Sequence, residues 1–250
     1  MFSIVATETS VLTFISIPGI AYRNNWLFLQ LAMGYMLGRV LVSIFLLPGY
    51  YGKGITSIYE TIEIRFGPLV QKIASMIFMI TRVLADGIRF LATAVIVQVI
   101  TGWSLTAAVL VIGVVTLIYT WSGGIRTVVL IDSFQFILYL SGAVISILYL
   151  INYIDNSFMQ IFSELFDSGK LKTIDATGNI FIAPWNFISA FIGGTLLSFA
   201  SHGADYMMVQ RVLGCKSLHD ARKAMIGSGV FVFIQFTLFL IVGSLLFIFF

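Results

Sequence analysis

The first apolar segment of the chain, residues 1–21, carries a group of polar residues in its middle. Residues 6–10 read Ala-Thr-Glu-Thr-Ser, and Thr13 follows three positions later. An unpaired hydroxyl or carboxylate in hydrocarbon costs several kcal/mol, so such groups usually face a cavity, an ion or another helix. The pattern therefore predicts an interruption of this segment. Pro18 and Gly19 are expected to mark the end of the segment.

Three charged residues, Arg82, Asp86 and Arg89, follow one another at spacings of four and three. These spacings place all three on one helical face. The trio could form a structural ladder of ion pairs. Alternatively, one arginine is left for an anionic substrate, because two cations face one carboxylate. A third interpretation places Arg82 in the cytoplasm or at the membrane interface.

Two further carboxylates lie within or beside apolar sequence. Asp132 lies near the start of a later apolar segment, next to Ser133, and Glu8 belongs to the polar group of the first segment. Hard cations take oxygen ligands, so either carboxylate is a candidate for binding a monovalent cation. Asp132 could equally bond a neighbouring hydroxyl or the turn before it. Glu8 could equally pair with an arginine such as Arg39.

A second polar cluster lies where the sixth apolar segment gives way to polar sequence. Its members are Ser198, Ser201, His202, Asp205 and Tyr206. Gly194 and Gly203 are able to loosen the helix there, although His202 by itself also fits a histidine packed between helices. Two interrupted helices at related positions in two halves of a chain indicate a transporter site at the membrane midplane.

The composition is that of a membrane protein. Of the 250 residues, 59% are hydrophobic and 10% are charged, and the mean hydropathy is +1.03. Soluble domains have about 25% charged residues. Apolar runs of about 20 residues recur along the chain, and each is long enough to cross a bilayer as one helix. We therefore predict one all-α, polytopic domain embedded in the lipid bilayer.

The sequence lacks the motifs of common enzyme classes. The patterns GxSxG, HExxH and GxxxxGK[ST] are absent, and the two histidines have no metal-ligand spacing. Lys and Arg residues lie in short loops and form no continuous stripe, so nothing indicates a nucleic-acid partner. One cysteine, Cys215, excludes an intramolecular disulfide framework. We expect a protein that is not an enzyme and has no catalytic residues.

Seven apolar segments are expected to cross the membrane. Polar stretches at residues 155–178 and 205–223 separate the later ones, and a tight turn is predicted at residues 122–127. A short interfacial helix, capped between Thr56 and Glu60, is expected after the second segment. The expected segments are residues 1–21, 26–48, 68–100, 105–121, 128–153, 182–201 and 225–250.

Basic residues are distributed unevenly between the two sides of the predicted bundle. With the turn near Arg23 and the 155–178 stretch outside, the outer side has three basic residues and the opposite side has eight. Cytoplasmic loops carry the excess of Lys and Arg. This places the amino terminus in the cytoplasm and predicts an integral, multi-pass protein of the plasma, or inner, membrane. The eight inner residues are Lys53, Arg65, Lys72, Arg126, Arg211, Lys216, Arg222 and Lys223.

Three stretches resemble the sodium/solute symporter family, which includes sodium-coupled sugar, sialic acid, proline, iodide and monocarboxylate transporters. They are residues 55–67 (ITSIYETIEIRFG), 122–135 (SGGIRTVVLIDSFQ) and 203–224 (GADYMMVQRVLGCKSLHDARKA). The resemblance implies the inverted-repeat fold of the leucine transporter. It implies a first five-helix repeat in residues 1–153, an extracellular loop in 154–181, and the first two helices of the second repeat in 182–250. Because the chain stops inside an apolar run at Phe250, we expect an incomplete member of the family.

The resemblance also implies a set of site residues. Backbone carbonyls of Ala6 and Thr9 would bind the main Na+, and Asp132 matches a carboxylate that helps to form a second sodium site in some members. Ser10 and Thr13 would line the substrate pocket from the first segment. The other expected substrate residues are Gln30, Arg82, Arg89, Ser198, Ser201 and His202.

The implied activity is sodium-coupled symport of a small polar or organic-anion solute by alternating access, with Na+ as the coupling ion. Two alternatives remain open at this point. One is a membrane sensor or input domain that keeps the same fold without transport. The other is a truncated, inactive product. The sequence gives no indication of oligomeric state.

Overall fold

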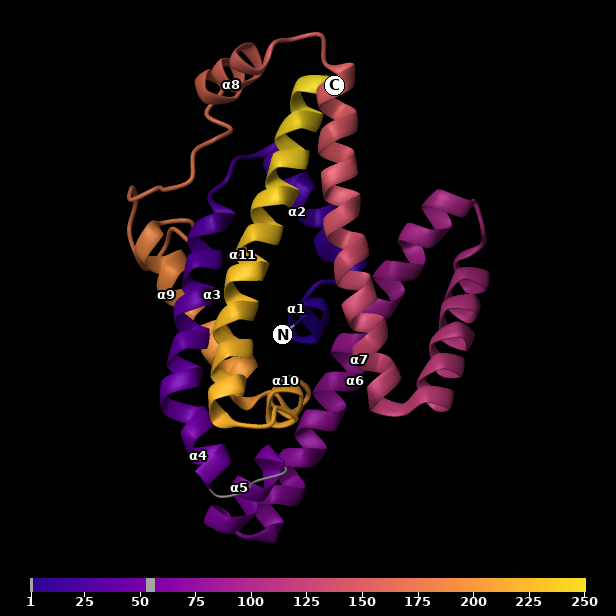
Figure 1. Cartoon of the computed structure of the whole chain (residues 1–250), viewed down its shortest axis with the longest axis vertical. Coiled ribbons are helices and arrows are strands. Elements are labelled where there is room, and N and C mark those ends of the chain that lie inside the picture. The colour runs from indigo at the N-terminus through magenta and orange to yellow at the C-terminus, as the bar shows by residue number, and fades with distance from the viewer. Residues whose placement is uncertain (1, 53–56) are drawn as a thin grey trace.

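The computed structural model of the protein describes residues 2–52 and 57–250, apart from the side chains of residues 2, 3, 119 and 122–126. Every regular element in this part of the chain is a helix (Figure 1). The helices are α1 (Phe2–Glu8), α2 (Val11–Arg23), α3 (Phe28–Leu41), α4 (Leu47–Gly52), α5 (Ile58–Phe66), α6 (Pro68–Thr101), α7 (Leu105–Tyr153), α8 (Phe158–Asp167), α9 (Phe187–Ala204), α10 (Tyr206–Leu213) and α11 (Leu218–Phe249). A π-helical turn, Val42–Leu46, joins α3 to α4.

Each of the seven predicted segments contains an apolar helix. Within the described residues, five helical stretches are long and apolar enough to cross a membrane. The first and fourth segments hold the shorter apolar helices Val11–Arg23 and Leu105–Ile118. The five longer stretches are Phe28–Gly52, Pro68–Thr101, Thr127–Tyr153, Phe187–Ala204 and Leu218–Phe249.

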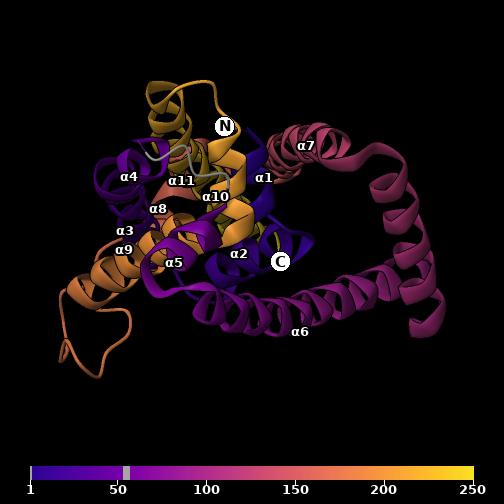
Figure 2. The ribbon, with the colours of Figure 1, turned by 90° about the horizontal axis from the view of Figure 1, so that it is seen from below.

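Helix α7 combines the fourth and fifth predicted segments. Its two apolar parts, Leu105–Ile118 and Thr127–Tyr153, run in opposite directions (Figure 1). The tight turn predicted at residues 122–127 falls mainly outside the residues whose placement is described. Seen from below, α6 and the first part of α7 extend away from the other helices (Figure 2). These two helices therefore form an arm beside a more compact bundle.

Two short helices lie in stretches that the sequence indicated only as polar. Helix α8 lies within residues 155–178, and α10 lies within 205–223. Both begin at a residue whose side chain accepts hydrogen bonds from the first turn: Ser157 for α8 and Asp205 for α10. Such caps satisfy N–H groups that have no partner inside the helix. The expected interfacial helix is α5, and Ser57 caps it.

Several predicted boundaries of apolar segments were wrong, among them the start of the seventh, because α11 begins at Leu218 and not at residue 225. Pro18 and Gly19 do not close the first segment, because α2 continues through them to Arg23. Gly243 of α11 lies so close to the Pro18 carbonyl that a methyl group there would overlap it. Neighbouring helices commonly compensate for a proline within a membrane helix. The sixth segment is helical only from Phe187, since residues 182–185 lie in non-helical backbone before Asn186, which caps α9.

Glycines bring α3 and α9 into backbone contact. A methyl group on Gly34 would overlap the Phe191 carbonyl, and one on Gly194 would overlap the Leu31 carbonyl. Small residues of this kind allow close helix packing in membranes, where lipid is as apolar as the side chains. Helix α11 packs against α3 of this pair, and α1 and α2 pack in turn against α11 (Figure 1). The bundle thereby fixes the first segment relative to α9, and these two elements carry the polar groups.

Candidate functional site

The first segment is interrupted between α1 and α2, as predicted. Ser10 caps α2: its hydroxyl accepts from the Thr13 N–H at 3.4 Å, and its own N–H donates to Thr13 Oγ1 at 3.4 Å. In a continuous helix these two N–H groups would donate to the carbonyls of Ala6 and Thr9. The capping box therefore diverts the usual donors of both carbonyls that were predicted to bind Na+.

Helix α11 closes one side of the interruption. The buried Thr9 hydroxyl lies 3.0 Å from the Val5 carbonyl oxygen and 3.1 Å from Gln235 Oε1. Gln235 is fully buried as well, and Ala6 is 4% exposed. The interruption is thus held in the interior by a contact between the first segment and α11, and oxygen atoms of several kinds surround it.

A buried network of charges joins α1, α3 and α9. Glu8 Oε2 pairs with the Arg39 guanidinium, and Glu8 Oε1 lies 2.5 Å from His202 Nε2. Arg39 is fully buried and also donates to the Ser228 hydroxyl at 2.6 Å. The prediction that Glu8 could pair with Arg39 is confirmed. Removal of one partner from a buried ion pair strongly destabilises a protein, because the other charge stays buried without compensation.

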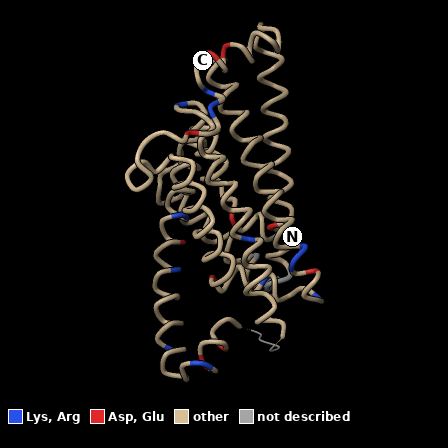
Figure 3. The backbone as a smooth tube through the Cα atoms, turned by 90° about the vertical axis from the view of Figure 1, so that its left-hand side faces the viewer, with Lys and Arg blue, Asp and Glu red and all other residues tan. Residues whose placement is uncertain are grey.

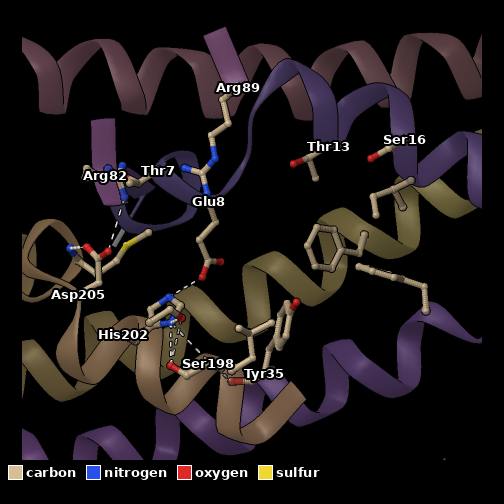
Figure 4. Close-up of a pocket in the computed structure, with 16 residues that line it drawn as sticks. Thr7, Glu8, Thr13, Ser16, Tyr35, Arg82, Arg89, Ser198, His202 and Asp205 are labelled. Carbon is tan, nitrogen blue, oxygen red and sulfur yellow. Dashed lines mark hydrogen bonds and ion pairs between the residues drawn. The ribbon is translucent and has the colours of Figure 1, made fainter. Parts of the chain in front are cut away.

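A cavity of about 340 Å³ lies beside the interruption, between α1, α2, α6 and α9 (Figure 4). Six of the predicted substrate residues line it: Thr13, Arg82, Arg89, Ser198, Ser201 and His202. Its polar lining also includes Thr7, Glu8, Ser16, Tyr35 and Asp205, which the sequence did not assign to a pocket. The two predicted polar groups are therefore on opposite walls of one cavity.

The helix axis also breaks at the second polar group. Helix α9 ends at Ala204 and α10 begins at Tyr206, with Asp205 as the non-helical residue between them. Asp205 accepts from the N–H groups of Met207 and Met208 and lies 3.6 Å from an Arg82 nitrogen. The loosening predicted near Gly203 is thus present one to two residues later, at the edge of the cavity.

The three charged residues of α6 form the predicted ladder, and its two arginines line the cavity. Arg82 Nε lies 2.8 Å from Asp86, and the Arg89 guanidinium lies 3.7 Å from the same carboxylate. Arg82 is additionally paired with Asp205, and its side chain is 22% exposed against 55% for Arg89. Arg82 is therefore held by two carboxylates, whereas Arg89 has one longer contact and extends toward the cavity (Figure 4).

Gln30 is buried away from this cavity, in a contact with the long polar loop. Its amide group donates to the Trp185 carbonyl at 3.0 Å and accepts from the Asp175 N–H at 3.0 Å. Hydrogen bonds from the Thr177 side chain and backbone, together with Lys172, lower the pKa of Asp175 to about 2. Gln30 thus secures α3 to an ordered loop. Its assignment to the substrate pocket stays a prediction.

Asp132 forms an ion pair with Arg211. The Arg211 guanidinium lies 2.8 Å from Asp132 Oδ2, and both side chains are largely buried. The pair joins α7 to α10 and gives Asp132 a structural contact. The assignment of Asp132 to a second sodium site stays a prediction. The assignment of Ser10 to the substrate pocket also stays a prediction, and its hydroxyl takes part in the α2 cap.

Several residues of the network were missed because they lie singly within apolar runs. Ser228 and Gln235 occur in the apolar sequence of α11, and both are fully buried. Isolated polar residues in a membrane helix usually face the bundle interior. That signal was present in the sequence, but their partners Arg39 and Thr9 are more than 180 residues away. The pairing could be found only in the folded chain.

The helices that are long and apolar enough to cross a membrane, and the interrupted segment beside a polar cavity, define a polytopic, all-helical membrane protein. The sequence pattern of the Sodium:solute symporter family matches residues 1–250, and the chain belongs to this family. The predicted resemblance is confirmed. The chain is an integral, multi-pass membrane protein.

Curated relatives are similar to the chain over most of its length. The human sodium/iodide cotransporter is 28% identical over 242 residues, which cover 97% of this chain and 36% of that protein. Human sodium-coupled monocarboxylate transporter 1 is 29% identical over 223 residues, which cover 89% of this chain and 36% of the relative. The chain thus spans about a third of the length of these relatives.

A solved structure shares the fold. The substrate-bound, outward-open structure of a Na+-coupled sialic acid symporter superposes with a TM-score of 0.85 at 27% identity. The match covers 99% of this chain and 52% of that chain. The predicted all-α fold of the leucine-transporter type, present in part, is confirmed.

Proposed function

We propose that these helices belong to a sodium-coupled symporter that moves a small polar or organic-anion solute by alternating access. The observation that carries the proposal is the capped interruption between α1 and α2 beside the polar cavity. The membership in the family and the names of the relatives support it. The work of the protein is then movement of a solute rather than a chemical conversion.

The sodium ion is proposed to bind at the interruption. The carbonyls of Ala6 and Thr9 are the first ligands, because the capping box diverts their helical donors. Carbonyl oxygens at the ends of half-helices bind cations in transporters of this general design. Asp132 is retained as a ligand of a second ion, which would require it to exchange its contact with Arg211.

The solute is proposed to occupy the cavity. Thr13, Ser198 and Ser201 offer hydroxyl groups, and Arg89 offers a positive charge that Asp86, 3.7 Å away, partly balances. A guanidinium group binds carboxylates and similar anions through paired hydrogen bonds. This favours an organic anion within the wider class of small polar solutes.

Transport follows from differential binding of sodium and solute to two arrangements of the helices. Sodium at the interruption stabilises the arrangement in which the cavity accepts solute, and the filled cavity favours closure. The membrane potential contributes about 2.3 kcal/mol per charge per 100 mV. We place residues 1–153 in the first repeat and 182–250 at the start of the second. The amino terminus then faces the cytoplasm of a plasma, or inner, membrane.

Uptake into proteoliposomes tests this function. An inward Na+ gradient is compared with an equal gradient of choline, using radiolabelled solutes suggested by the relatives: iodide, a monocarboxylate and sialic acid, with a neutral sugar for comparison. We expect Na+-dependent accumulation of at least one solute and accompanying Na+ influx. Equal uptake under Na+ and choline, with no solute-dependent Na+ influx, would support a sensor or an inactive product instead.

A further inference from the structure

An apolar cavity of about 530 Å³ lies between α8 and the ends of α7 and α11. Ile151 lines it from the end of α7, and Ile161 and Leu165 line it from α8. Ile241 and Leu245 of α11 add to the same apolar wall. The volume falls in the range of about 300–1,000 Å³ that ligand pockets have. The cavity shares no lining residue with the polar cavity beside the interruption, so it is a separate candidate site.

The polar groups in the lining of this apolar cavity are mostly paired with the protein itself. Trp26 Nε1 donates to the Ser244 hydroxyl at 2.8 Å, and the Thr173 hydroxyl donates to the Leu171 carbonyl at 3.0 Å. Asn156 is exposed, and no charged side chain is among the described residues of the lining. A buried water needs about 2–4 polar partners, and lining atoms without neighbours lose dispersion contacts. The chemistry of the lining therefore favours an apolar occupant.

The apolar cavity opens toward the lipid-facing surface. Helix α8 lies at the end of the bundle where α7 and α11 also end (Figure 1). Phe158, Phe162 and Phe166 share one face of α8, line the cavity and are 77%, 48% and 67% exposed. A helix with one apolar and one polar face lies in the interface of a bilayer. The polar face of α8 consists of Gln160, Ser163, Glu164 and Asp167.

The charges around α8 favour a positive group at this interface. Asp155, Glu164 and Asp167 are all exposed. Lys170 is buried, and its ammonium group donates to a backbone carbonyl of α2 at 2.6 Å. Lys172 is paired with a loop carboxylate at 3.0 Å. An ammonium headgroup is therefore attracted to the surface of α8, whereas a purely anionic headgroup is repelled.

We propose that the apolar cavity holds an acyl chain of a zwitterionic phospholipid from the adjacent leaflet of the bilayer. The acyl chain passes between the exposed phenylalanines of α8 and contacts Ile241 and Leu245 of α11. The headgroup stays at the interface, with its ammonium near Glu164. Phosphatidylethanolamine has this chemistry. The bound lipid joins α8 to the ends of α7 and α11, and it is separate from the Na+ and the solute proposed above.

Trp26 is a reporter for this site, because its indole lines the cavity. Bromine atoms on an acyl chain quench tryptophan fluorescence on contact. The chain has four tryptophans, and Trp103→Phe, Trp121→Phe and Trp185→Phe together leave Trp26 alone. The three replaced residues are exposed and lie outside the cavity lining, so this protein is expected to fold.

Quenching in bilayers that contain equal amounts of phosphatidylethanolamine and anionic phosphatidylglycerol tests the proposal. The lipid composition is kept constant, and the brominated chains are placed either on the first lipid or on the second. We expect a greater loss of Trp26 fluorescence when phosphatidylethanolamine carries the bromine. Equal losses with the two labels would overturn the proposal, because contact with lipids at random gives that result. No loss with either label would show that protein covers the cavity, and would also overturn the proposal.

A change inside the cavity separates a chain bound there from lipid at the outer surface. Ile241→Phe narrows the cavity and should reduce the loss of Trp26 fluorescence. Ile234→Phe is the control on the same helix, because Ile234 is 46% exposed and lies outside the lining. Equal losses in these two variants would contradict binding inside the cavity. The readout involves neither Na+ nor solute, so failure of Na+-driven uptake would leave this proposal intact, and the reverse also holds.

Discussion

The two arginines of α6 differ in how firmly neighbouring carboxylates hold them. Arg82 contacts both Asp86 and Asp205, whereas Arg89 shares Asp86 at 3.7 Å and is more than half exposed. The spacing in the sequence placed them on one face but could not distinguish them, because Asp205 lies more than 100 residues away. At this scale the structure makes Arg89 the stronger candidate for binding an anion.

We predict that Arg89→Gln raises the half-saturation concentration of an anionic solute by about 10- to 100-fold. A hydrogen bond to a charged group contributes about 1.5–3 kcal/mol, and each 1.4 kcal/mol corresponds to about tenfold. The half-saturation concentration of Na+ should change by less than about twofold, since no Na+ ligand is removed. Uptake kinetics with each concentration varied in turn provide the measurement.

Lys72→Gln is the matched control for this change, because Lys72 is an exposed cation on the same helix, outside the cavity lining. It should leave both half-saturation concentrations unchanged. If Arg89→Gln shifts the values for solute and Na+ equally, Arg89 belongs to a structural ladder and does not bind the solute.

Close packing between α3 and α9 fixes the helix that carries Ser198, Ser201 and His202 relative to α3. We predict that Gly194→Ala lowers the free energy of unfolding by about 1–3 kcal/mol, as overpacking does, because its methyl group would overlap the Leu31 carbonyl. Gly193→Ala is the control on the same helix, since nothing lies within 4 Å of a methyl group there. Thermal melting in detergent gives the comparison. Equal melting temperatures for the two variants would contradict the packing described.

Elements were predicted correctly where all the residues that define them lie within one segment of the sequence. The break at Thr9 and Ser10 follows from local capping chemistry and from polar residues in an apolar run. The burial of Gln30 could not be predicted, because its partners belong to a loop about 145–155 residues later. Likewise, Pro18 was interpreted as a helix end, because its close contact with Gly243 cannot be predicted from the sequence. Partners distant in sequence account for each of these differences.

Charge along the whole molecule favours one orientation in the membrane. Figure 3 shows charged residues at both ends of the structure and a smaller group within the bundle. The basic excess lies on the side that contains Lys216, opposite the loop that contains Lys172. In a Cys215→Ser background, an impermeant maleimide should label Lys172→Cys in intact cells. Lys216→Cys should react only after permeabilisation, and the reverse pattern would contradict the orientation.

For the whole molecule, the proposed coupling depends on Na+ binding at the interruption between α1 and α2. The direct measurement is thermal unfolding in NaCl against equal concentrations of choline chloride, which requires no knowledge of the solute. Ligand at about 100 times its Kd stabilises a protein by about 2.7 kcal/mol. We predict that Na+ specifically stabilises the wild-type protein. Ser10→Ala should lose this stabilisation, because it removes the cap that diverts the N–H donors from the two carbonyls. Ser141→Ala, which removes an exposed hydroxyl on α7, is the control and should retain it. Identical melting temperatures of the wild-type protein in the two salts would contradict Na+ binding at the interruption.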